Sequence, residues 1–152
     1  MKVWQLKKTD ITINPESEVE ADYTVPATQE QIEALGKVVV GEAWMTSQPY
    51  QMGPAVIKFA PPYEHVGERG VNDLWLWEKC YSKIIIIAER EETASLALPL
   101  PGANPHLKGG GDAIRQAVKA LCEQLKQVKY LRHLHIYAVD EDDALKLFKM
   151  FS

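Results

Sequence analysis

The chain has 152 residues, the size of a single domain that can bury a core without disulfides or a structural metal. Hydrophobic residues make up 46% and charged residues 25%, which is typical of globular chains and excludes a disordered, collagen-like or coiled-coil protein. The formal net charge is −4, so the chain lacks the basic field that binding to duplex nucleic acid uses. We therefore expect one domain over residues 1–152 and no duplex nucleic acid as a partner.

The cysteines and the amino terminus indicate the compartment. Cys80 and Cys122 form no C-x-x-C pair, so neither a disulfide framework nor a zinc ribbon is indicated. The opening MKVWQLKKTD has no apolar signal-peptide core, and the aliphatic run 84–88 is far shorter than the roughly 20 residues that cross a bilayer. We expect no signal peptide, no membrane span and a cytoplasmic location.

Proline and glycine residues divide the first part of the chain into short elements. Segments rich in β-branched and aromatic residues predict strands over 3–6, 11–13, 20–25, 37–46 and 55–60. Thr28 can cap a short helix over 29–35, and Gly36 would end that helix.

The run Ile84–Ile87 resembles a buried strand, but its wider spacing predicts a helix. Apolar residues recur at intervals of three and four, the period of one helical face. These residues are Leu74, Trp77, Tyr81, Ile84, Ile85 and Ala88. Asn72 or Asp73 supplies the cap, so we expect one long helix over 72–91.

The second half predicts alternating strands and helices. We expect a strand over 94–98, a loop over 99–111, a helix over 112–126, a strand over 131–139 and a last helix over 140–151. This alternation predicts an α/β domain with three layers, α/β/α, in which helices cover both faces of a mixed central sheet.

The loop 99–111 is the main candidate site, because it joins the carboxyl end of a strand to the start of a helix. Ligands of open α/β sheets bind there, and the free N–H groups of a helix start favour anions. The candidate residues are Gly102, Ala103, Asn104, Gly109, Gly110 and Gly111. The alternative is a surface loop whose glycines only let the chain enter the helix, with Asp112 as the cap. No Walker, dinucleotide-binding, nucleophile-elbow or zincin motif is present.

His133, His135 and Tyr137 are expected to point to one face of their strand. A zinc site with His106 or Asp140 as a third ligand is imaginable, but the spacing does not require one. We interpret these residues as partly exposed strand histidines and expect no metal and no cofactor.

The tryptophans divide between the expected core and the surface, and the acidic run 140–143 lies at an expected helix start. Trp77 and Trp44 are expected in the core, whereas Trp75 faces away from the apolar stripe and suits a surface or ligand contact. The acidic residues open a helix, where they favour its dipole, so paired-carboxylate catalysis is not indicated.

Several short strings then follow one another in a characteristic order. Thr9-Asp10-Ile11-Thr12 resembles a G-D-I-T string, Gly41-Glu42-Ala43 opens a G-x-A strand, and residues 55–61 resemble Y-V-I-H-x-V-G-P. The strand through Leu98, the helix from Asp112 and the last strand complete the order. In this series the chain resembles a shortened, divergent macrodomain.

The resemblance implies a module that binds ADP-ribose or a related nucleotide. It assigns adenine contacts to Asp10 and Ile11, and Tyr137 lies close to the position of a stacking aromatic residue. The family's N-A-A-N string would fall at residues 24–27, which read Thr-Val-Pro-Ala, and its second phosphate loop is replaced around 101–105. The asparagine that contacts the distal ribose is therefore missing.

Three functions follow from this mixture of kept and lost residues. The first is binding of an ADP-ribose-like or nucleotide-like ligand at the carboxyl edge of the sheet, with its anion against Gly102, Ala103 and residues 109–111 and its base near Asp10. The second is a scaffold without ligand that serves a protein partner. An ADP-ribosyl hydrolase is third, and we expect no hydrolysis.

Overall fold

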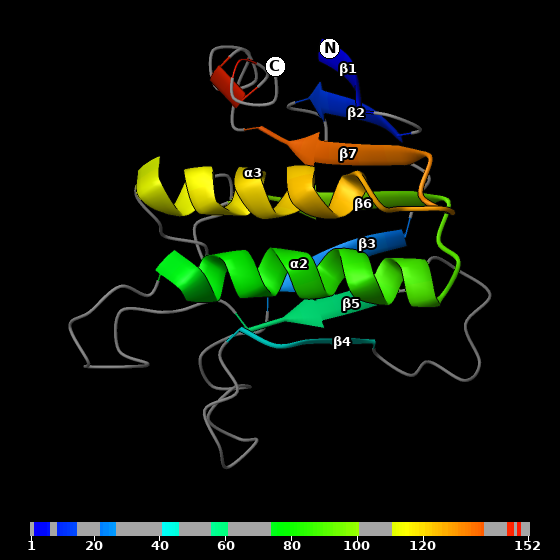
Figure 1. The fold of residues 1–152 in the computed structure, drawn as a ribbon, viewed down its shortest axis with the longest axis horizontal. Helices are drawn as coiled ribbons and strands as arrows, with labels where there is room; N and C mark the ends of the chain where they lie inside the picture. Colours follow the sequence, from blue (N-terminus) through cyan, green and yellow to red (C-terminus); the bar gives the residue numbers. More distant parts are fainter. Residues whose placement is uncertain are drawn as a thin grey trace.

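The structure is a computed structural model that describes residues 2–6, 9–14, 22–26, 41–45, 56–60, 74–100 and 111–138, together with 146, 147 and 149. Figure 1 shows its helices and strands. Their order is β1 (Lys2–Leu6), β2 (Thr9–Asn14), β3 (Asp22–Pro26), β4 (Ala43–Met45), β5 (Val56–Phe59), α2 (Leu74–Arg90), β6 (Ser95–Pro99), α3 (Gly111–Leu125) and β7 (His133–Tyr137).

The strands form one mixed sheet in the order β1-β2-β7-β6-β3-β5-β4. The inner strands β2, β7, β6, β3 and β5 run parallel, whereas β1 and β4 pair antiparallel at the two sides. Parallel strands end at the same edge of a sheet, which we call the carboxyl edge; the opposite one is the amino edge. The strand ends at the carboxyl edge are Asn14, Pro26, Phe59, Pro99 and Tyr137.

Helices α2 and α3 lie side by side over one face of this sheet (Figure 1). The predicted helix over 72–91 is confirmed as α2, and the isoleucines of its middle are helical. Ile84 and Ile85 are buried, whereas Ile86 is 47% exposed, which is the alternation of a helix with one apolar side. Three of the four isoleucines, Ile84, Ile85 and Ile87, therefore face the core, and Ile86 faces outward.

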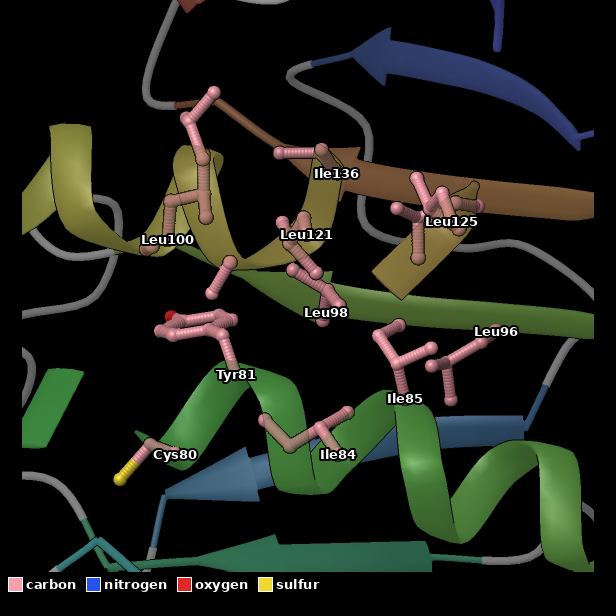
Figure 2. Close-up of a cluster of buried hydrophobic side chains, with 14 of the residues drawn as sticks. Cys80, Tyr81, Ile84, Ile85, Leu96, Leu98, Leu100, Leu121, Leu125 and Ile136 are labelled. Carbon is pink, nitrogen blue, oxygen red and sulfur yellow. The ribbon is translucent and has the colours of Figure 1, made fainter. Parts of the chain in front are cut away.

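The core lies between these helices and the sheet. Figure 2 shows Tyr81, Ile84 and Ile85 of α2 against Leu96 and Leu98 of β6. Side chains from α3 and β7 complete the cluster: Leu121, Leu125 and Ile136. Alternate residues of the strands supply these contacts, because successive strand side chains point to opposite faces.

Most predicted elements are confirmed with shifted ends. The strand expected over 37–46 is β4, and within the described residues it begins only at Ala43. Gly41 explains this correction, because its φ of +91° makes a turn there. The α/β fold with a mixed central sheet is confirmed. The helix over 29–35 and most of 140–151, which would form the second helical layer, lie outside the described residues; Lys146, Leu147 and Lys149 are helical.

A carboxylate of α2 fixes the entry to β7. Glu89 accepts hydrogen bonds from the backbone N–H groups of Lys129, Tyr130 and Leu131, the last two at 3.0 Å. This contact ties the end of α2 to the turn that places β7 between β2 and β6. No helix in the described part of the chain combines the length and the apolarity needed to cross a bilayer.

Candidate functional site

The carboxyl edge brings Tyr137 next to the strand ends of β2 and β6. Tyr137 pairs with Asn14 on one side and with Pro99 on the other. Its side chain is partly buried, and this burial raises the pKa of Tyr137 above its ordinary value. At neutral pH the phenol therefore keeps its proton, so it can donate a hydrogen bond and offer a flat ring to a ligand.

Helix α3 supplies backbone donors near this edge. It spans Gly111–Leu125 and follows β6 in the chain, so it returns from the carboxyl edge toward the amino edge. The first N–H groups of a helix have no partner within the helix, and the helix dipole makes that end attractive to anions. Gly111, one of the predicted site residues, is the first residue of this helix.

The buried Tyr81 of α2 is hydrogen-bonded to the end of β6. The Tyr81 hydroxyl donates a hydrogen bond to the Pro99 carbonyl at 2.5 Å, and its ring packs against Phe59 with centroids 5.7 Å apart. Burial raises the pKa of Tyr81 well above its ordinary value, so the hydroxyl remains a donor. This bond positions the start of the loop 99–111. Sequence reasoning placed Tyr81 in the core but missed its hydroxyl contact, for which the sequence holds no signal.

At the carboxyl edge, the turn before β4 is hydrogen-bonded to the end of β5. Gly41 N–H donates to Ala60 O and Ala60 N–H donates to Glu42 O, both at 2.8 Å. A Cβ at position 41 would lie 2.9 Å from Cδ of Lys79, which would have to shift, and the φ of +91° at this turn itself favours glycine. The Cys80 thiol donates to Ala60 O at 3.1 Å, and burial raises the pKa of Cys80 to about 12. Cys80 is thus a packed thiol and no nucleophile.

The other predicted residues of the loop 99–111 lie outside the described residues: Gly102, Ala103, Asn104, Gly109 and Gly110.

Asp10 lies at the other end of the sheet from Tyr137. It is the second residue of β2 and pairs with His133, the first residue of β7, at the amino edge. Strands rise about 3.3 Å per residue, so roughly 13 Å of β2 separate Asp10 from the pair Asn14–Tyr137. The expectation that Asp10 and Tyr137 line one cleft is corrected: the T-D-I-T string opens a strand, so its carboxylate lies at the start of that strand.

Ile11, the other residue expected to contact the adenine, also requires a correction. Its side chain is completely buried in the core cluster. It packs on the face of the sheet that α2 and α3 cover and is not available to a ligand.

The predictions for the tryptophans are confirmed for Trp77 and Trp75 and only in part for Trp44. Trp77 is buried, as predicted, and Trp75 is 59% exposed, which confirms that it points away from the apolar side of α2. Trp44 in β4 is only partly buried, so the core accounts for part of its surface.

The strand histidines share one face, as predicted. Their rings stack with centroids 6.2 Å apart. Burial lowers the pKa of His135, and the neighbouring His133 adds to this effect. Within the described ranges, no three His, Cys, Asp or Glu side chains gather closely enough to hold a metal ion.

The chain is similar to known proteins in its fold. No family model matches the sequence, and no curated protein matches it. The Oceanobacillus iheyensis macrodomain with ADP has a TM-score of 0.74 at 13% identity, over 99% of this chain and 93% of that one. The Trypanosoma brucei macrodomain in complex with ADP-ribose has a TM-score of 0.67 at 17% identity, over 97% and 70%. The chain therefore has a macrodomain-like α/β fold.

Proposed function

We propose that the protein is a binding module for an ADP-ribose-like or nucleotide-like ligand at the carboxyl edge of its sheet. The observation that carries the proposal is that β2, β7 and β6 end at the edge from which α3 starts, with the partly buried Tyr137 as the last residue of β7. The macrodomains of similar fold that were solved with ADP and ADP-ribose support this class of ligand. Open α/β sheets generally bind ligands at this edge.

Each part of the ligand would meet a group suited to it. A diphosphate would lie against the first N–H groups of α3 from Gly111, where no Cβ blocks its approach to the backbone. Tyr137 would stack on a base or donate its phenol proton to a ribose or phosphate oxygen. The loop 101–110, with Gly102, Ala103, Asn104, Gly109 and Gly110, would complete the anion site. Asp10 is no part of this site, since it lies at the amino edge.

A scaffold without ligand is the second candidate. The N-A-A-N string of the resembling family falls at residues 24–27, which read Thr-Val-Pro-Ala, and Pro26 ends β3. The asparagine that contacts the distal ribose is therefore missing, and no side chain of this string offers an amide group to a ribose. For the same reason we propose no hydrolase activity, because catalysis requires the reacting group to be held in place.

Calorimetric titration of the full chain with ADP-ribose separates these candidates. Binding is expected in the parent protein, and Tyr137→Ala is expected to weaken it by about tenfold, which corresponds to about 1.4 kcal/mol. Tyr130→Ala is a matched control, because Tyr130 is an exposed tyrosine just before β7, on the amino-edge side. Asp10→Ala is a second control with expected parent affinity.

The outcomes are distinct. Absence of heat at millimolar ADP-ribose would favour the scaffold. Loss of binding in Asp10→Ala with retention in Tyr137→Ala would place the ligand at the amino edge and contradict the proposed site. Thermal melting of each variant checks that the chain remains folded.

A further inference from the structure

The face of the sheet opposite α2 and α3 carries a row of polar side chains at the amino edge. In β7, Leu134 and Ile136 are buried toward the helices, so His133 and His135 point to the other face. The parallel neighbour β2 places Asp10 directly beside His133. We call Asp10, His133 and His135 the histidine row.

The row is open to solvent and compact. The imidazole rings of His133 and His135 are nearly parallel, with 19° between their planes and 6.2 Å between centroids. Nδ1 of His133 lies 3.9 Å from a carboxylate oxygen of Asp10. The side chains of His133 and Asp10 are 52% and 42% exposed, so a small solute can reach them.

Hydrogen bonds within the described part of the chain do not occupy Nδ1 of the inner histidine. Nδ1 of His135 is buried and has no hydrogen-bond partner among the described residues. Buried polar atoms are paired in the great majority of cases, so an orphaned imidazole nitrogen is unusual and needs an explanation. Because this nitrogen makes no hydrogen bond, no such bond has to break when the ring tilts toward His133.

Two imidazoles on alternate residues of one strand are suited to chelate a metal ion. Neutral imidazole is the commonest protein ligand of borderline divalent ions, which bind nitrogen at about 2.0–2.1 Å. That bond length places two ligand nitrogens about 3 Å apart, so the rings would have to tilt toward each other. The absence of a third suitable side chain among the described residues means that water or a small anion would fill the other positions.

We propose that His133 and His135 form a two-imidazole site for a borderline divalent transition-metal ion, with Asp10 as a positioning residue. The Asp10 carboxylate stands beside Nδ1 of His133, the nitrogen that is left when Nε2 binds the ion. A carboxylate that moves from this 3.9 Å separation to hydrogen-bond distance orients the ring and increases its basicity. The proposed nucleotide site lies farther along the same strand, at Tyr137 on the carboxyl edge.

Calorimetric titration of the chelator-stripped full chain with Ni²⁺ and with Zn²⁺ tests the proposal. We expect one binding event per chain, and a loss of at least about tenfold in affinity in His133→Asn and in His135→Asn, because each removes one of only two protein ligands. Asp10→Asn should weaken binding less than either histidine variant. Mg²⁺ should give no binding, since it prefers oxygen ligands.

His106→Gln is the matched control, because it removes a histidine that the proposal does not use. Paramagnetic broadening by Ni²⁺ should affect the imidazole signals of His133 and His135 first, which keeps the test valid if one variant fails to fold. The proposal is overturned if the parent chain binds neither ion, if His135→Asn binds as the parent does, or if His106→Gln causes the larger loss.

Discussion

The two faces of the central sheet differ in chemistry, although they belong to the same strands. Toward α2 and α3, β2 and β7 present Ile11, Ile13 and Leu134, which are fully buried. On the other face the same strands carry Asp10 and His133, which are substantially exposed. The first face holds the fold together, whereas Asp10 and His133 on the second face approach each other only to 3.9 Å. Substitutions on the first face should therefore lower the free energy of unfolding more than substitutions on the second face.

The largest expected effect tests this difference within two strands of the same sheet. Leu98→Ala in β6 should lower the free energy of unfolding by about 2–5 kcal/mol, because Leu98 is fully buried among α2, α3 and the sheet. Thr12→Ala in β2 points to the other face and should cost less than about 1 kcal/mol. Urea denaturation followed by circular dichroism measures both. Equal losses would show that the second face is packed as tightly as the first.

An intermediate effect is expected at the polar contact between α2 and the start of β7. Glu89→Ala removes the acceptor of three backbone N–H groups and should cost about 1–3 kcal/mol. Glu89→Gln keeps one acceptor oxygen and should cost less. The control Glu123→Ala changes an exposed glutamate of α3 and should stay within about 0.5 kcal/mol. A loss in Glu123→Ala as large as that in Glu89→Ala would refute the role of the contact.

The smallest effect is expected at the exposed pair Glu42–Lys79, whose charged atoms are 2.9 Å apart. The hydrogen bond from Lys79 lowers the pKa of Glu42 below 4.5. The contribution of the Glu42–Lys79 pair to the free energy of unfolding is therefore present above pH 4.5 and is lost as the pH falls through the folded-state pKa of Glu42. Glu42→Gln should cost less than about 1 kcal/mol at pH 7, because both side chains are exposed. At pH 3 the difference from the parent should shrink, and a constant difference in urea titrations at the two pH values would contradict the assignment.

The sequence predicted the core well because burial leaves a periodic pattern. The spacing of Trp77, Tyr81 and Ile84 identified α2 despite its run of isoleucines. The site was predicted less well, because it depends on where a residue lies along its strand. A shift of β2 by a few residues decides whether Asp10 lies at the carboxyl or the amino edge, and a short string such as T-D-I-T carries no signal for that. The contacts of Tyr81 with Pro99 and of Glu89 with residues 129–131 join distant segments, so no local pattern indicates them.

Amide chemical-shift mapping on addition of ADP-ribose tests the central claim most directly. The account predicts that the perturbed amides cluster at the carboxyl edge, at Gly111 and around Tyr137, while those of Asp10 and His133 at the amino edge stay unchanged. Shifts centred on Asp10 and His133, or an unchanged spectrum at millimolar ligand, would contradict a nucleotide site at the carboxyl edge.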